Sequence, residues 1–375
     1  MHHTALQRWN DGVVRCPTDS RAGDARCRYA CRAPCGAALD ERGRLLGTCA
    51  IPTTTNGYGE LLRWAGQYGD LVQVGIEGTG SYGAGLARWL HARQVTVIEV
   101  DRPDRRTRRR RGKSDSVDAE AAARAVLAGV ATAQPKAGTG AMEMVRALRV
   151  ARQSAIKART QAANELHALV VTAPDAVRTR LRRLKISQLV ATASAFRTST
   201  ELTTPAAATK LALKSIARRY QQLSAEIDGL DEHLDQLVAH AAPALVDIKG
   251  VGTDIAATLL TIAGDNPERL SSEGAFAHLV GVAPIEASSG KITRYRLNRG
   301  GDRQGNRALY LLAVGRMGWD PATRAYVERR TAEGRTKPEI IRCLKRYIAR
   351  ELYPVLLAAS STLGSAGSSS PTGSA

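Results

Sequence analysis

Long apolar runs are missing from this 375-residue sequence. No stretch approaches the roughly 20 residues that a membrane-spanning helix needs, and the N-terminus lacks the apolar core of a signal peptide. We therefore expect a cytoplasmic protein without a membrane segment. Acidic residues are also scarce, since 35 Asp and Glu face 54 Lys and Arg, for a net charge of +19. This excess favours a polyanionic partner, nucleic acid before membrane, over a basic surface that serves only solubility.

Paired C-x-x-C motifs are absent, although five of the six cysteines lie within the first 49 residues. Cys27, Cys31 and Cys35 are each separated by three residues, and Cys16 or Cys49 offers a fourth thiolate, which is one way to build a zinc site. The lack of C-x-x-C knuckles argues against zinc.

The pattern of apolar residues changes along the chain and predicts the domain boundaries. Residues 1–36 show no clear hydrophobic period. Residues 37–140 alternate short apolar runs with helical patterns, which predicts a mixed α/β domain. Residues 141–243 repeat apolar positions at a spacing near 3.5 in two long segments, which predicts an antiparallel coiled-coil arm that can also mediate self-association. We expect a mainly helical domain over residues 244–357 and a disordered, Ser- and Gly-rich tail over 358–375.

Two glycines, Gly250 and Gly252, separate helical patterns in IKGVGTDIAATLL. The stretch resembles a helix-hairpin-helix turn, whose backbone N–H groups bind phosphate without reading base sequence. A tight helix connection without a ligand uses glycines in the same way, so both interpretations stay open.

Three carboxylates have the setting of a metal site. Glu77 ends a predicted buried strand, where α/β folds place their chemistry. Asp115 and Asp118 share one face of a first helical turn if Ser114 caps that helix, although the helix dipole alone would explain one of them. Converging carboxylates repel one another unless a divalent cation lies among them, and oxygen ligands suit Mg²⁺ or Mn²⁺. Two such ions, ~3.5–4 Å apart, promote in-line attack on a phosphodiester.

A dense basic run, DRPDRRTRRRRGK, directly precedes the two aspartates. Such a run is often only a solvated face. Beside a metal site, however, it could hold the phosphate backbone on which the metal acts. The residues predicted to bind nucleic acid here are Arg105, Arg106, Arg108, Arg109, Arg110, Arg111 and Lys113.

Three stretches together resemble the DEDD-type insertion-sequence transposases of the 110/116/902 group, over roughly residues 37–355. They are VGIEGTGSYGAGLARWL, VIEVDRPDRRTRRRRGKSDSVDAEAAARAVLAG and LVGVAPIEASSGKITRYRLNRGGDRQGNRALY. The resemblance implies a ribonuclease-H-like N-terminal domain of the Holliday-junction-resolvase type, a coiled-coil segment and a C-terminal transposase domain. It also implies four acidic metal ligands in the order Asp, Glu, Asp, Asp, of which Glu77, Asp115 and Asp118 match the last three.

The resemblance further implies a nucleophilic serine within EASSGK. Ser289, directly before Gly290, is our first choice and Ser288 the second, although Ser-Ser-Gly by itself is typical of a turn. Attack by a serine on phosphorus conserves bond energy in a covalent protein–DNA linkage, which suits strand exchange. A second polar and basic cluster is expected to bind phosphates near the serine; it comprises Lys291, Arg294, Arg296, Asn298, Arg299, Arg303, Asn306 and Arg307.

The partners that the resemblance implies are DNA, a structured guide RNA encoded by the element, and further copies of the chain in a dimer or tetramer. The DNA would supply both the element ends and the target. The predicted function is therefore that of a transposase, or site-specific recombinase, which cuts and rejoins DNA. Two alternatives are a junction-resolving nuclease that uses metal-activated water alone and a non-catalytic nucleic-acid-binding remnant.

The first aspartate of the family pattern is missing. The family places it at the end of the first strand, shortly before the stretch that matches AALDERGRLLG, but here that region reads GDARCRYACRAPCG. Neither Asp24 nor Asp40 follows an apolar run. A reading-frame disturbance would explain this gap, because codons for residues 26–36 shifted by one base can encode Val-Val-Asp-Thr-His-Ala-Ala-His-Leu-Val-Ala. Out-of-frame GC-rich codons often yield Cys, so the hypothesis also explains the cysteine cluster, and it predicts weak or absent strand cleavage by the chain as printed.

Overall fold

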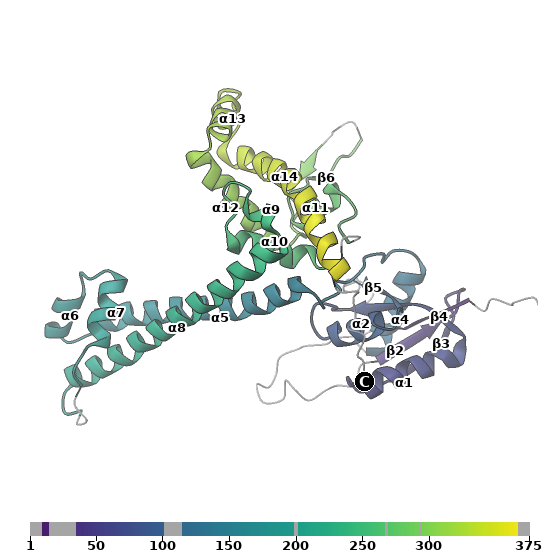
Figure 1. The fold of residues 1–375 in the computed structure, drawn as a ribbon, viewed down its shortest axis with the longest axis horizontal. Coiled ribbons are helices and arrows are strands. Elements are labelled where there is room, and N and C mark those ends of the chain that lie inside the picture. Colours follow the sequence, from purple (N-terminus) through teal and green to yellow (C-terminus); the bar gives the residue numbers. More distant parts are fainter. Residues whose placement is uncertain are drawn as a thin grey trace, which may run out of the picture. The chain divides into compact units, whose positions relative to one another are not determined.

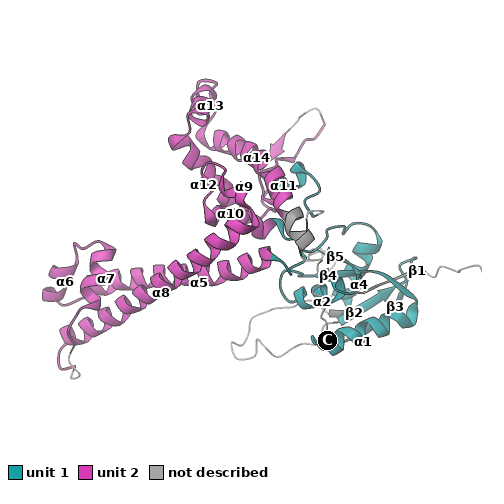
Figure 2. Ribbon diagram, viewed as in Figure 1, with its two compact units in different colours: residues 1–140, 263–276, 360–375 teal, residues 141–262, 277–359 magenta. Residues whose placement is uncertain are grey.

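The computed structural model describes residues 10–14, 35–100, 115–198, 202–266, 269–290, 292 and 294–366 (Figure 1). The chain divides into two compact units (Figure 2). Unit 1 comprises residues 1–140, 263–276 and 360–375, and unit 2 comprises residues 141–262 and 277–359. None of the described helices is both long and apolar enough to cross a membrane.

Unit 1 is built on a parallel three-stranded sheet in the order β1-β4-β5. Its strands are β1 (Asn10–Val14), β4 (Asp70–Glu77) and β5 (Thr96–Val100). A separate antiparallel pair consists of β2 (Cys35–Leu39) and β3 (Leu45–Ala50). Strand β1 lies within the segment that showed no hydrophobic period, and its pairing with β4 is irregular near Gly12.

Helices cover both faces of the sheet, because side chains alternate along a strand. Val74 and Ile76 of β4 lie in one core with α1 (Thr55–Ala65) and α2 (Ala84–His91). The short helix η1 (Gly66–Tyr68) follows α1. On the other face, Val100 of β5 packs with Ala122 and Val126 of α4 (Asp115–Leu127). The predicted mixed α/β architecture is thus confirmed for the N-terminal region.

Residues 263–276 belong with unit 1, although the sequence pattern assigned them to the C-terminal domain. Side-chain to backbone hydrogen bonds explain this placement. Asn266 Nδ2 donates to the carbonyl of Pro135 (3.1 Å), and Asp265 Oδ2 accepts from the N–H of Gly140 (3.4 Å).

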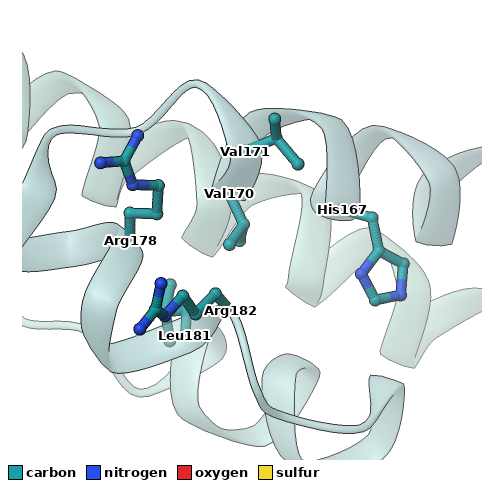
Figure 3. Close-up of a pocket in the computed structure, with 6 residues that line it drawn as sticks. All are labelled: His167, Val170, Val171, Arg178, Leu181 and Arg182. Carbon is teal, nitrogen blue, oxygen red and sulfur yellow. The ribbon is translucent and has the colours of Figure 1, made fainter.

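Two long helices, α5 (Ala141–Val171) and α8 (Pro205–Ala241), form the arm of unit 2 and run antiparallel side by side (Figure 1). Thr204 caps α8 by accepting from the N–H of Ala207, and Pro205 occupies the first turn, where its missing N–H costs nothing. At the tip, α6 (Asp175–Leu181) and α7 (Ile186–Ser194) close the arm. A hollow opens beside α6 (Figure 3).

The rest of unit 2 is mainly helical, as predicted. It contains α9 (Pro243–Val246), α12 (Arg303–Trp319), α13 (Pro321–Ala332) and a hairpin of β6 (Ile285–Glu286) and β7 (Tyr295–Arg296). It also contains α10 (Thr253–Ala263) up to Ile262, the end of α11 (Glu273–Leu279) from Ala277, and α14 (Lys337–Ala366) up to Ala359. The expectation that disorder begins at residue 358 was wrong for the described part of the tail. Leu356 and Ala359 are still buried, and the helix extends to Ala366.

Candidate active site

Glu77 and Asp118 lie in the same layer, between β4 and α4. A Cβ on Gly75 would come within 2.7 Å of Val126 Cγ2, so this face of β4 meets α4. Glu77 is two residues further along the strand and therefore shares the face of Gly75. Asp118 is one helical turn before Ala122, whose carbonyl also faces Gly75. Only 4% of Glu77 and 5% of Asp118 is exposed. Two of the predicted metal ligands thus enter one buried layer at the carboxyl end of the sheet.

Asp115 is the first residue of α4, so the helix begins at the residue predicted to follow its cap. The three-residue spacing places Asp115 and Asp118 one turn apart on that helix. The side chain of Asp115 lies outside the described residues, as do Ser114 and the basic run of residues 101–114. Within the described part of the chain, no three His, Cys, Asp or Glu side chains form a group that could hold a metal ion. The two described carboxylates still offer the oxygen donors that Mg²⁺ prefers.

The register of strand β1 places the backbone of Asp11 far from Glu77 along the sheet. The strand is parallel to β4, with Gly12 paired with Leu71 and Val14 with Val74. Asp11 therefore lies level with the start of β4, while Glu77 lies six residues beyond Leu71, or roughly 20 Å further along. The first ligand of a four-acid site would be needed at the opposite end of the sheet.

Asp40 is also unsuited to be the missing ligand, because it organises the β2–β3 turn. Its Oδ1 accepts from the backbone N–H of Arg44 (2.8 Å) and of Arg42 (3.0 Å). These hydrogen bonds lower the pKa of the Asp40 carboxyl. Neither Asp11 nor Asp40 therefore supplies the first acidic ligand of the family pattern within the described part of the chain.

The loop that follows Glu77 is anchored by a residue that the sequence did not single out. The hydroxyl of Thr79 donates to Glu99 Oε1 at 2.5 Å, and Arg269 Nη2 lies 3.5 Å from Glu99 Oε2. Gly78 has a φ of +67°, a conformation that favours glycine at the end of β4. Glu99 thus fixes the loop from the neighbouring strand. An acidic residue inside the apolar run VIEV was the only signal in the sequence.

The two candidate serines lie on an exposed hairpin between β6 and β7, at the tight turn around Gly290. Ser289 and Ile292 exchange two backbone hydrogen bonds, at 3.2 and 3.1 Å. The Ser288 hydroxyl accepts from the N–H of Arg294 at 3.1 Å and also contacts its carbonyl. The Ser289 hydroxyl makes no hydrogen bond to a described residue. The structure therefore distinguishes the two serines, which the sequence could only rank.

Two asparagines of the predicted phosphate-binding cluster make hydrogen bonds within the protein. Asn306 Nδ2 donates to the carbonyls of Val280 (3.1 Å) and Gly281 (2.9 Å), and its Oδ1 accepts from Lys345 Nζ (2.9 Å). Asn298 Nδ2 donates to the carbonyl of His278 (3.0 Å). Through these contacts both side chains secure the segments that flank the serine hairpin, and phosphate binding by either asparagine stays a prediction.

The arginines of the same cluster are exposed. No described carboxylate lies within ion-pair distance of any of the five; these are Arg294, Arg296, Arg299, Arg303 and Arg307. Lys291 lies outside the described residues. Other arginines of unit 2 do form ion pairs, as Arg316 does with Glu351 at 2.6 Å. The surface near Ser289 therefore keeps positive charge that an anionic ligand can neutralise.

The Gly-Val-Gly turn joins the four-residue helix α9 to α10. Gly250 has a φ of +87°, and a Cβ there would come within 2.8 Å of Leu312 Cδ1 in α12. Gly250 thus has a packing reason for being glycine. Nothing lies within 4 Å of a Cβ placed on the exposed Gly252, at the start of α10. Phosphate binding at this turn stays a prediction, and Gly252 is the position left accessible for it.

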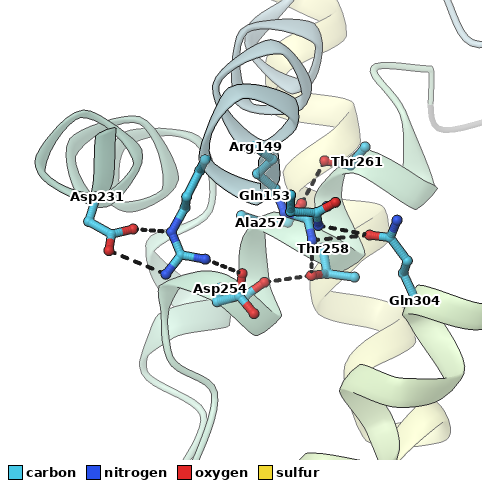
Figure 4. A network of polar contacts seen from close by, with 9 residues as sticks. Arg149, Gln153, Asp231, Asp254, Ala257, Thr258, Thr261 and Gln304 are labelled. Carbon is cyan, nitrogen blue, oxygen red and sulfur yellow. Dashed lines mark hydrogen bonds and ion pairs between the residues drawn. The ribbon is translucent and has the colours of Figure 1, made fainter. Parts of the chain in front are cut away.

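A polar network fastens the arm to the base of unit 2 (Figure 4). Arg152 of α5 forms ion pairs with Asp231 of α8 and, at 3.2 Å, with Asp254 of α10. Arg149, 6% exposed, donates to Thr258 Oγ1 at 2.6 Å and to Gln304 Oε1 at 3.4 Å. Burial lowers the pKa of Arg149, and its Nε has no hydrogen-bond partner among the described residues. Helices α5, α8, α10 and α12 are held together by these contacts.

Comparison with known proteins finds two matching family models. One is described as a transposase, of the DEDD type of IS110, and matches residues 35–173; the other is the transposase IS116/IS110/IS902 family and matches residues 242–328. An uncharacterized 43.6 kDa protein of insertion element IS110 from Streptomyces coelicolor is 34% identical over 146 residues, which are 38% of this chain and 34% of that protein. An uncharacterized 42 kDa protein of insertion element IS900 from Mycobacterium paratuberculosis is 26% identical over 144 residues, 38% of this chain and 36% of that protein. The matched segments span about a third of each relative.

Proposed function

Because this chain belongs to the IS110/IS116/IS902 family of DEDD transposases, we propose that it is built to cut and rejoin DNA with Ser289 as the nucleophile. The N-terminal unit would be ribonuclease-H-like, with Glu77, Asp115 and Asp118 as its metal-binding acids. Mg²⁺ or Mn²⁺ would be the ion, since all three donors are carboxylates.

One observation carries the choice of Ser289. Its hydroxyl makes no hydrogen bond to a described residue, whereas the hydroxyl of Ser288 is engaged with the backbone of Arg294. A nucleophile must lose its proton and approach phosphorus, and a hydroxyl that already serves the hairpin would have to break its contacts first. The exposed, unpaired arginines of the hairpin surface would bind the phosphates that flank the scissile bond.

The proposed chemistry conserves the phosphodiester bond energy. Ser289 Oγ forms a bond to phosphorus, the bond from phosphorus to a deoxyribose oxygen breaks, and the Ser289 proton leaves while the released oxygen gains one. Reversal with a second DNA end as the attacking hydroxyl regenerates the serine and rejoins the strands. A bound divalent cation would stabilise negative charge on the phosphoryl oxygens.

The chain as printed lacks the first acid of the family pattern, so we propose that its cleavage activity is weak or absent. The register of β1 supports this proposal, because Asp11 lies at the wrong end of the sheet. A structured guide RNA and a dimeric or tetrameric assembly are further proposals that follow from the family resemblance.

The test is to trap a covalent protein–DNA adduct on labelled DNA that carries the element ends. The protein should be compared as printed and with residues 26–36 replaced by VVDTHAAHLVA. We expect an adduct only from the replaced version, loss of the adduct in its Ser289→Ala variant, and retention within a few-fold in its Ser288→Ala variant. The latter is the matched control one residue away.

Three outcomes would contradict the proposal. An adduct that survives Ser289→Ala would remove this serine from the mechanism. Metal-dependent cleavage without any adduct would favour the junction-resolving nuclease. Salt-dependent DNA binding without cleavage by either version would favour a non-catalytic remnant.

A further inference from the structure

Charge is distributed unevenly along the arm of unit 2. Between residues 157 and 219, which include its distal half, twelve Lys and Arg face three Asp and Glu. Residues 226–235 of α8, nearer the base, carry five acidic residues and no Lys or Arg. The acidic stretch includes Asp231, which pairs with Arg152 in the network at the base. The positive charge of the tip has no comparable acidic partner in the sequence around it.

The tip is a packed structure that can hold these charges in place. Its core contains Leu166 of α5, Leu181 of α6, Leu189 of α7 and Leu213 of α8, each at most 1% exposed. Lys214 Nζ donates to the carbonyl of Phe196 at 2.7 Å, which ties the end of the α7 segment to α8. The basic side chains therefore project from a small bundle of helices with a packed apolar core.

Two basic residues of the tip, Arg178 and Arg182, line the hollow beside α6, and Arg183 and Lys185 follow them in the sequence. This hollow has a volume of about 290 Å³ and is lined by His167, Val170, Val171, Arg178, Leu181 and Arg182 (Figure 3). Arg178 pairs with Asp175. Arg182, Arg183 and Lys185 are exposed, and no described carboxylate lies within ion-pair distance of them. The tip thus combines a concave surface with at least three uncompensated cations.

We propose that the arm tip, defined as Arg178, Arg182, Arg183 and Lys185 with the hollow, is a docking surface for the phosphate backbone of duplex DNA. The proposal rests on the proposed function only in that the protein acts on DNA. Val171 at the tip lies nineteen helical positions after Arg152 at the base, so the tip would contact DNA about 30 Å along the arm from its attachment. Such contacts add affinity and orientation without reading sequence.

Two features favour a duplex over the other occupants of a basic surface. Phe196 is the only aromatic residue between 172 and 198, and it is buried beneath the guanidinium of Arg180. Among the described side chains of the tip, no Phe, Tyr or Trp ring is exposed, and His167 is the single ring that lines the hollow. One imidazole does not form a platform on which successive single-stranded bases could stack. A second arm tip is equally basic and would repel this one, which makes tip-to-tip association unfavourable.

The experiment measures how the affinity for a 40-base-pair duplex depends on salt. Each lost phosphate contact lowers the slope of log K against log salt by about 0.9. We expect the variant Arg182→Ala, Arg183→Ala, Lys185→Ala to lose about 2 to 3 from that slope. The matched control, Arg324→Ala, Arg335→Ala, Lys337→Ala, removes the same charge from exposed positions of unit 2 and should leave the slope nearly unchanged. Unchanged circular dichroism verifies folding, and Arg182→Gln serves as a milder variant with a loss near 1.

Two results would overturn the proposal. One is an equal loss of slope in both triple variants, which would mean that only net charge matters. The other is a tip variant that weakens binding to duplex RNA but not to duplex DNA. The Ser289→Ala variant should bind DNA as tightly as the parent, so failure of the catalytic proposal and failure of this one are separate outcomes.

Discussion

Asn306 lies among basic residues in the sequence, and the structure gives it three hydrogen bonds to the protein itself. From the sequence alone, the amide of an asparagine and the guanidinium of an arginine are both candidates to bind phosphate. Their hydrogen-bond partners in the structure distinguish the two, because an amide that donates to two backbone carbonyls would have to break these hydrogen bonds to bind phosphate. The neighbouring Arg303 and Arg307 keep their exposed positions and their charge.

Gly300 and Gly301, which precede α12, differ in how closely the protein surrounds them. A Cβ on Gly301 would come within 2.3 Å of the backbone N of Gly281, whereas a Cβ on Gly300 meets only Asn298 Oδ1 at 3.5 Å. The backbone of Gly281 cannot move away from an added methyl group as easily as a flexible side chain can. We expect Gly301→Ala to lower the free energy of unfolding of unit 2 by about 2 kcal/mol or more, and Gly300→Ala by less than about 1 kcal/mol. Urea unfolding of both variants measures this, and equal effects would contradict the assignment.

Asp320 gives a residue-scale prediction for pH. It caps α13 by accepting from the hydroxyl (2.6 Å) and the N–H (2.9 Å) of Thr323, which lowers the pKa of its carboxyl. A lowered folded-state pKa stabilises the fold above the ordinary value of about 3.9, and this stabilisation is lost as pH falls through the folded pKa. In Asp320→Asn, which retains a capping oxygen, the stability should change less between about pH 5 and pH 2 than in the parent. Parallel acid-unfolding curves would refute this.

At the scale of elements, the junction of α5 with α10 and α12 contains two arginines with different surroundings. Arg152 has two carboxylate partners, whereas the buried Arg149 has a hydroxyl and an amide and leaves its Nε unsatisfied. An ionised side chain that is buried without a carboxylate partner adds little to stability, and an apolar side chain of similar volume can replace it.

We therefore expect Arg149→Met to change the free energy of unfolding by less than about 1 kcal/mol, or to raise it, because Thr258 still donates to the carbonyl of Asp254 at 2.6 Å. Arg152→Met should lower it by about 1–3 kcal/mol, since it leaves Asp231 and Asp254 without their partner. Thermal or urea unfolding of the two variants compares them directly. A larger loss in Arg149→Met than in Arg152→Met would show that the buried guanidinium fastens the arm.

At the scale of the whole molecule, binding and cleavage should separate. The net charge of +19 predicts DNA binding that needs no metal, whereas the acids in the β4–α4 layer predict cleavage that does. In the version with residues 26–36 replaced, EDTA or Glu77→Gln should abolish cleavage and leave DNA affinity within a few-fold. Gel-shift and cleavage assays on one DNA measure both. Loss of binding in step with cleavage would contradict the division.

The sequence by itself determined the family and the mixed α/β and helical character of its two regions. Apolar alternation in LVQVGIE and VTVIEV, the 3.5-residue repeats of the arm and the motifs around Glu77, Asp118 and Ser289 are local patterns. Such local patterns can be recognised without knowing which distant segments contact one another. The net charge and the missing first aspartate are visible in the same way, because they depend only on which residues are present and in what order.

The tertiary structure decided the burial and the hydrogen-bond partners of those residues. It separated Ser289 from Ser288, gave Asn298 and Asn306 hydrogen bonds within the protein, gave Glu99 a role beside Thr79, and placed Asp11 at the wrong end of the sheet. It also placed residues 263–276 with unit 1 and extended α14 to Ala366. The physical reason is common to all of these. Burial, strand register and hydrogen-bond partners arise from segments far apart in the chain, and no local pattern records where those segments meet.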